Sequence, residues 1–137
     1  MIDALASADA LLAAQKIAAG EVIGLPTETV YGLAADAQNP QAVARIFSLK
    51  DRPTNHPLIT HIAADGDIHY WLDGVRMTVD MSDIMDTLIE AFWPGPLTLV
   101  LPKSPAINDA VTGGQDTIAL RCPDHALAQS VLRALSE

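Results

Sequence analysis

The feature that most constrains the fold of this chain is the alternation of short apolar runs with amphipathic helical patterns. The apolar runs have the length of buried strands and lie at 22–25, 58–62, 97–101 and 117–121. The helical patterns lie at 4–19, 40–50, 81–92 and in the segment after Pro123. Strands that alternate with helices over 137 residues predict one α/β domain with a mixed or partly parallel sheet.

Individual residues mark where one of the helices begins and ends. Asn39 and Pro40 are typical of an N-cap and a first helical position. Because Pro53 disfavours helical angles at the residue before it, the helix that starts there should end by Asp51. Two connecting segments are predicted to be a polar loop and an irregular or weakly helical stretch, at 26–32 and 64–75 respectively.

The charge and the cysteine count exclude several classes of protein. Asp and Glu total 17 against 8 Lys and Arg, and the formal charge of -9 disfavours general binding to nucleic acids or anionic lipids. A few cations in a cleft can still bind a small anion, because distant exposed charges are screened. The single cysteine, Cys122, excludes an internal disulfide and a multi-cysteine zinc site, and fits a reducing, cytoplasmic setting. Neither a metal site nor a membrane span is predicted.

A first candidate for chemistry is the segment Pro26-Thr27-Glu28-Thr29-Val30-Tyr31-Gly32-Leu33. It follows an apolar run, and open α/β sheets bind ligands where their strands end. Its hydroxyls, carboxylate and phenol are suited to a pocket wall. They are equally suited to a solvated loop with local side-chain-to-backbone hydrogen bonds, and both interpretations remain open.

A second candidate is the segment Lys50-Asp51-Arg52-Pro53-Thr54-Asn55-His56-Pro57-Leu58. Lys50 and Arg52 are two of only eight basic residues, and in an extended stretch their side chains would point to the same side and could bind a polyanion. The alternative is a helix C-terminus whose cations favour the helix dipole. The segment has neither the Walker pattern nor the glycine-rich dinucleotide pattern.

Three further features have both a structural and a functional interpretation. The turn Trp93-Pro94-Gly95-Pro96 is either a helix stop with Trp93 in the core or part of a site. His61, in an apolar run, is either a core residue or a ligand-binding residue. Arg121, at a strand end, either contacts a substrate or phosphate or pairs with nearby Asp124.

Together these segments resemble the YrdC-like family, the threonylcarbamoyl-AMP synthases. The resemblance covers almost the whole chain, in the order and spacing of the family. It rests on GLPTETVYGLAADA at 24–37, IFSLKDRPTNHPLITHI at 46–62, FWPGPLTLVL at 92–101 and TIALRCPDH at 117–125.

The resemblance implies an α/β fold, a twisted open mixed sheet with flanking helices around a concave cavity. It implies a nucleotidyltransferase that converts L-threonine, bicarbonate or CO₂, and ATP into threonylcarbamoyl-AMP and pyrophosphate, with Mg²⁺ accompanying the ATP. The product would reach tRNA through downstream transfer proteins that place the threonylcarbamoyl group on an adenosine.

The resemblance also assigns roles to residues of this chain. Lys50 and Arg52 match the Lys-x-Arg pair of the family and are assigned to the ATP phosphates and to catalysis, with His56 and Thr98 as further ATP contacts. Thr29 and His61 match positions that hold threonine. Further candidates for the pocket wall are Thr27, Tyr31 and Arg121.

One departure from the family pattern concerns a Ser-x-Asn motif that works with the Lys-x-Arg pair, because no such sequence occurs in this chain. We therefore expect residues 1–137 to form a YrdC-like domain that is incomplete at its C-terminus, with weak or no synthase activity. Two alternative functions remain: a non-catalytic RNA-binding protein, and a carbamoyltransferase domain that forms a carbamoyl adenylate.

Overall fold

The computed structural model describes residues 4–26, 31–51, 53 and 55–135, with the side chains from residue 9 onward, Tyr31 excepted. The elements follow the predicted alternation of helices and strands. In chain order they are α1 (Ala4–Ala18), β1 (Ile23–Pro26), β2 (Tyr31–Ala34), α2 (Pro40–Lys50), β3 (Ile59–His61), the 3₁₀ helix η1 (Ile68–Trp71), α3 (Val79–Phe92), β4 (Leu99–Pro102), β5 (Thr117–Arg121) and α4 (Ala126–Leu135).

The strands form two sheets. Strand β5 is the centre of a three-stranded sheet, parallel to β3 on one edge and antiparallel to β4 on the other. Strands β1 and β2 form a separate antiparallel pair. The prediction of an α/β fold with a mixed sheet is therefore confirmed.

The predicted loop over 26–32 is wrong at both of its ends. Pro26 belongs to β1, and Tyr31 and Gly32 begin β2, where Tyr31 is in register with Pro26 and Gly32 with Leu25. Residues 27–30 lie outside the described residues. A four-residue strand such as β2 is too short for a periodic sequence signal, and only its pairing with β1 defines it.

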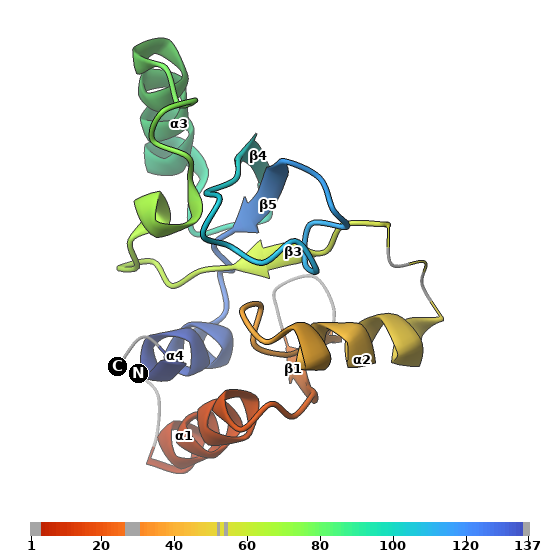
Figure 1. Ribbon diagram of the computed structural model, residues 1–137. Coiled ribbons are helices and arrows are strands. Elements are labelled where there is room, and N and C mark those ends of the chain that lie inside the picture. The colour runs from red at the N-terminus through yellow and green to blue at the C-terminus, as the bar shows by residue number, and fades with distance from the viewer. Residues whose placement is uncertain (1–3, 27–30, 52, 54, 136–137) are drawn as a thin grey trace.

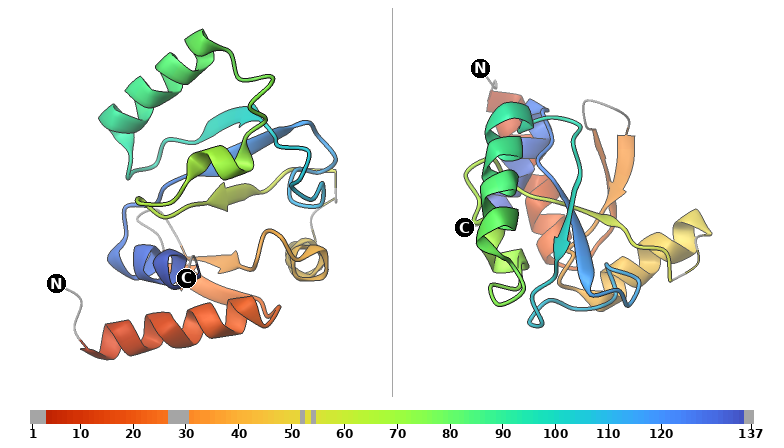
Figure 2. Two further views of the ribbon diagram at one scale, coloured as in Figure 1. Left: turned by 60° about the vertical axis from the view of Figure 1, so that its left-hand side comes forward. Right: turned by 90° about the horizontal axis from the view of Figure 1, so that it is seen from above.

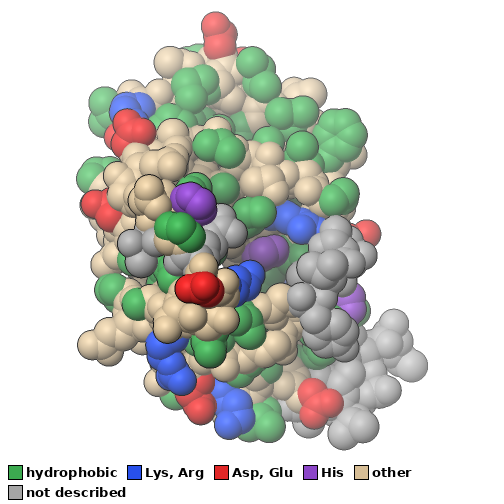
Figure 3. All heavy atoms as spheres, turned by 90° about the vertical axis from the view of Figure 1, so that its right-hand side faces the viewer, with side chains coloured by type: hydrophobic (Ala, Val, Ile, Leu, Met, Phe, Trp, Pro, Cys, Tyr) green, Lys and Arg blue, Asp and Glu red, His purple; other side chains and the backbone are tan. Residues whose placement is uncertain are grey.

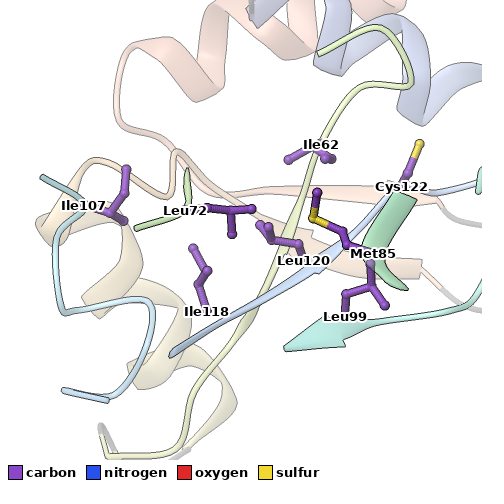
Figure 4. Close-up of a cluster of buried hydrophobic side chains, with 8 residues drawn as sticks. All are labelled: Ile62, Leu72, Met85, Leu99, Ile107, Ile118, Leu120 and Cys122. Carbon is purple, nitrogen blue, oxygen red and sulfur yellow. The ribbon is translucent and has the colours of Figure 1, made fainter. Parts of the chain in front are cut away.

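The elements are arranged in layers around the three-stranded sheet (Figures 1 and 2). Helix α3 covers one side of this sheet, and α1, α2, α4 and the β1–β2 pair lie on the other side. The largest cluster of buried side chains lies between the sheet and α3. It consists of Ile62, Leu72, Met85, Leu99, Ile107, Ile118, Leu120 and Cys122 (Figure 4).

Two smaller clusters stabilise the other side of the molecule. Ala10, Ala14 and Ile17 of α1 pack with Val131 of α4, against the β1–β2 pair. A third cluster joins α2 to the loop before β5. Among the described residues, none of the helices combines the length and the apolar character needed to cross a lipid bilayer.

Side-chain caps explain the helix boundaries. The Asn39 side chain accepts hydrogen bonds from the backbone of Gln41 and Ala42, and Asp51 ends α2 in the left-handed conformation with φ 51°, so both predicted ends of this helix are confirmed. Helix α3 begins at Val79 rather than at residue 81, because the Thr78 hydroxyl accepts a hydrogen bond from the Met81 N–H at 3.1 Å.

Arg76 fixes the edge of the sheet where β4 ends and β5 begins. Its guanidinium donates to Asp73 Oδ2 at 2.9 Å and to Asp116 Oδ2 at 3.1 Å. It also donates to the carbonyl oxygens of Lys103 at 3.1 Å and Asp116 at 2.7 Å. One side chain thus joins the turn before α3 to both strands.

Replacing Asp73 with Asn tests this arrangement through its pH dependence. The hydrogen bond from Arg76 lowers the pKa of Asp73 below its usual value. A carboxyl whose pKa is lower in the folded chain stabilises the fold above its unfolded pKa of about 3.9, and this contribution is lost as the pH falls through the folded-state value. We therefore expect wild type to melt at a higher temperature than Asp73→Asn at pH 7, by a margin that shrinks towards pH 3.

Circular dichroism melts at both pH values check this expectation. Asp86→Asn, on the exposed surface of α3, is the matched control, because it removes the same charge away from Arg76. A margin between wild type and Asp73→Asn that stays constant, or grows as the pH falls, contradicts the stabilising role of the Asp73–Arg76 pair.

Candidate functional site

A cavity of about 890 Å³ lies on the side of the three-stranded sheet opposite α3, between the sheet and helices α1, α2 and α4. Its walls come from β2 and the segment that follows it, from α2, β3, η1 and β5, and from α4. Figure 3 shows this face of the molecule, where Lys, Arg and His side chains gather around a hollow. Three residues predicted for the site line the cavity, namely Lys50, His61 and Arg121.

The register of the sheet brings two of these residues side by side. His61 of β3 is in register with Arg121 of β5, and residues opposite each other in a sheet share a face. His61 and Arg121 therefore form a pair, which we call the polar row. Thr98 precedes β4 and lies outside the lining of the cavity.

A second row on the same face is apolar. Ile59, Ala119 and Val100 are in register with one another, and Ile59 and Val100 are 46% and 64% exposed. The residues between the two rows, such as Leu120, point to the opposite face and into the core under α3. This face of the sheet thus carries a polar row beside an apolar one, and Ile59 is the member of the apolar row that lines the cavity.

Arg121 is held by the turn that follows α3. Only 8% of its surface is exposed, and its Nε donates to the Gly95 carbonyl oxygen at 3.3 Å. The Gly95 N–H donates to the carbonyl of Cys122 at 2.8 Å, so the turn is fastened to the end of β5. Trp93 packs against the core and its indole N–H donates to the Leu97 carbonyl at 2.8 Å. The turn is therefore a helix stop with a core tryptophan and also a support for Arg121.

Lys50 reaches the cavity from the wall opposite the sheet. It is the last residue of α2, as the helix-end interpretation predicted, and its side chain is exposed at the cavity. The extended geometry that would place Lys50 and Arg52 on one side is wrong, because Asp51 has a left-handed conformation. Arg52 itself lies outside the described residues.

The remaining predicted site residues are less well placed or lie outside the described residues. His56 is exposed and lies outside the lining of the cavity. Thr27 and Thr29 lie outside the described residues, as does the side chain of Tyr31. The cavity therefore brings together Lys50, His61 and Arg121 among the residues predicted from the sequence.

Sequence analysis missed a contact that joins the two walls. The Tyr70 hydroxyl of η1 donates to Gln38 Oε1, just before α2, at 2.6 Å, and both residues line the cavity. They come from connecting segments without periodicity, so no sequence signal identifies them. Two carboxylates also line the cavity, Asp36 and Asp67, and each accepts a hydrogen bond from a nearby backbone N–H.

The arrangement has a clear chemical character. Basic side chains stand on two opposite walls, with two carboxylates and apolar surface beside them, which suits a zwitterion with an apolar part. In the part of the chain that the structure describes, no cluster of three or more His, Cys, Asp or Glu residues could hold a metal ion.

Comparison with known proteins identifies the family. Residues 15–137 match the model of the Sua5–YciO–YrdC family, whose description reads "Telomere recombination". The chain belongs to this family. It is 44% identical over 126 residues to the threonylcarbamoyl-AMP synthase of Pyrococcus abyssi and 46% identical over 122 residues to that of Bacillus subtilis.

These matches cover 92% and 88% of this chain, and only 35% and 34% of the two relatives. The threonylcarbamoyl-AMP synthase of Vibrio campbellii is 36% identical, and the match covers 86% of this chain and 62% of that protein. The chain thus spans about a third of the length of two of these relatives and less than two thirds of the third.

Solved structures share the fold. A crystal structure of P. abyssi Sua5 complexed with L-threonine matches with a TM-score of 0.86 and 40% identity, over 96% of this chain and 37% of that one. The crystal structure of E. coli YciO matches with a TM-score of 0.75 at 22% identity, over 96% of this chain and 61% of that one, which supports the fold alone.

Replacing Gly95 with Ala tests how closely the turn that holds Arg121 is packed. A Cβ at this position would lie 2.5 Å from the Phe92 carbonyl oxygen, so the turn must shift. We expect the free energy of unfolding to fall by about 1–3 kcal/mol in a urea titration. Gly74→Ala is the matched control, because a Cβ there meets open space, and its expected effect is within about 0.5 kcal/mol. Equal stability of the two variants contradicts the close packing of this turn.

Proposed function

We propose that this chain carries the amino-acid and nucleotide site of a threonylcarbamoyl-AMP synthase. The observation that supports it most strongly is the position of His61 beside Arg121 on the wall of a cavity of about 890 Å³. The fold is one shared, at 40% identity, with a protein crystallised with L-threonine. The volume lies within the range of roughly 300–1,000 Å³ that is usual for small-molecule sites.

The two rows of the sheet face suit L-threonine. The guanidinium of Arg121, with His61 beside it, can form charge-assisted hydrogen bonds to a carboxylate. Ile59, which lines the cavity, offers apolar surface to the methyl group of the amino acid. Thr29, assigned to threonine by the family resemblance, is part of the same proposal.

ATP is proposed to lie towards the opposite wall. Lys50 supplies a positive charge there, and Arg52 is proposed to act with it on the phosphates. Thr98 and His56 are proposed as further nucleotide contacts, with Thr27 and Tyr31 in the pocket wall. Mg²⁺ enters this proposal as part of the substrate, bound to the ATP phosphates.

The proposed reaction needs positioning and charge neutralisation more than a protein nucleophile. The amine of threonine takes up CO₂, forming an N–C bond and losing a proton, to give a carbamate. A carbamate oxygen then attacks the α-phosphorus of ATP, and the bond to the departing pyrophosphate breaks. Lys50 and Arg52 would neutralise the phosphates, and the polar row would hold the amino acid in line with them.

The product, threonylcarbamoyl-AMP, is an activated acyl group. We propose that downstream transfer proteins pass its threonylcarbamoyl group to an adenosine of tRNA. The family resemblance assigns part of the nucleotide site to a Ser-x-Asn motif, which the 137 residues do not contain. We therefore propose that these residues bind the substrates and turn them over slowly or not at all.

Isothermal titration of the chain with L-threonine and, separately, with ATP and Mg²⁺ tests the assignment. His61→Ala should weaken threonine binding about tenfold, the loss of one charged hydrogen bond, and leave ATP binding within about twofold. Lys50→Ala should do the reverse.

His69→Ala and Lys16→Ala are the matched controls, because both side chains are exposed and lie outside the cavity lining. Equal losses for the two ligands in His61→Ala would assign His61 to the core. A folded wild-type chain that binds neither ligand would refute the proposed function.

A further inference from the structure

We propose that Gln129 is a positioning residue for the amino-acid side of the cavity. It ties the ends of β3 and β5 together and so keeps His61 beside Arg121. The inference rests on the proposed function for the identity of the ligand, L-threonine. Gln129 lies in α4 and is absent from the cavity lining, so it would act through the two strands.

The side-chain amide of Gln129 makes polar contacts to both strand ends. Its Oε1 accepts a hydrogen bond from the Ala64 N–H, just after β3, at 2.9 Å. Its Nε2 donates to the carbonyl oxygen of Pro123, just after β5, at 2.7 Å, and lies 3.4 Å from Cys122 Sγ. The donor and the acceptor of one amide group thus bind two segments that are far apart in the sequence.

The strand pair needs such a tie at this end. β3 has only three residues, and its pairing with β5 is parallel, the slightly less stable arrangement. The Ile62 N–H donates to the Arg121 carbonyl at 2.9 Å, the last backbone hydrogen bond between these two segments among the described residues. Gln129 continues the connection immediately beyond this last backbone hydrogen bond, next to His61 and Arg121.

The buried position of Gln129 indicates that its side-chain amide has a specific role in this structure. Only 7% of its surface is exposed, and its neighbours Ala128 and Val131 in α4 are fully buried apolar residues. An apolar side chain of similar volume would fill the same space without the cost of burying an amide. Because its side-chain contacts are to the two strand ends, Gln129 should affect the polar row and leave Lys50 of α2 unaffected.

Two substitutions separate this role from general stability. Gln129→Leu keeps most of the volume and removes all of these polar contacts. Gln129→Glu keeps an acceptor for the Ala64 N–H and loses the donor to Pro123, so it still tests the tie if the Leu variant fails to fold. Ala14→Gly is the control, because Ala14 is buried between α1 and α4 without lining the cavity itself, and glycine within a helix lowers stability.

The experiment combines amide hydrogen exchange with titration of L-threonine and of ATP with Mg²⁺. In Gln129→Leu we expect the Ile62 amide to exchange about tenfold faster and threonine to bind about tenfold more weakly, which corresponds to the loss of one or two hydrogen bonds. ATP affinity should stay within about twofold, Gln129→Glu should lie in between, and Ala14→Gly should leave both affinities unchanged.

The possible failures are distinguishable. If wild type binds threonine and the Gln129 variants lose threonine and ATP affinity equally, or leave Ile62 exchange unchanged, Gln129 is not a positioning residue. A wild-type chain that binds no threonine refutes the proposed function, and this inference with it, before any variant is compared.

Discussion

The pairing of β5 with β3 and β4 is the constraint on which both the core and the candidate site depend. Alternate residues of β5 face opposite sides, so Ile118 and Leu120 enter the core under α3 while Arg121 lines the cavity. A register shift of one residue would expose Leu120 to the cavity and bury Arg121 in the core. The apolar core therefore fixes the position of the charged group.

Side chains hold this strand at both of its ends. At the start of β5, Arg76 binds the backbone of Lys103 and Asp116. At its end, Gly95 accepts a hydrogen bond from Arg121, and Gln129 binds Pro123 together with Ala64. Short strands form few backbone hydrogen bonds with their neighbours. These polar side chains therefore help to fix the position of β5, as additional backbone hydrogen bonds would do in a longer strand.

The position of Lys50, His61 and Arg121 explains how an acidic chain can bring basic side chains together in one cavity. The formal charge of -9 describes the whole sequence, whereas Lys50, His61 and Arg121 line one cavity. The carboxylates in the same lining, Asp36 and Asp67, accept hydrogen bonds from backbone N–H groups. The charged groups in the lining therefore determine the electrostatic character of the cavity more than the net charge of the chain does, because exposed charges at a distance are screened.

The sequence by itself determined the four α-helices, four of the five described strands, the ends of α2 and the family, because Asn39, Pro53 and the quoted motifs act locally along the chain. The sequence identified Lys50, His61 and Arg121 as candidate site residues, but it did not show that they line one cavity. Tertiary structure alone decided that His61 stands beside Arg121, that β2 pairs with β1, and that Gln129 joins two strand ends. These features depend on contacts between segments that are not adjacent in the sequence. Strand register and side-chain burial stabilise such contacts, whereas local conformational propensity does not specify them.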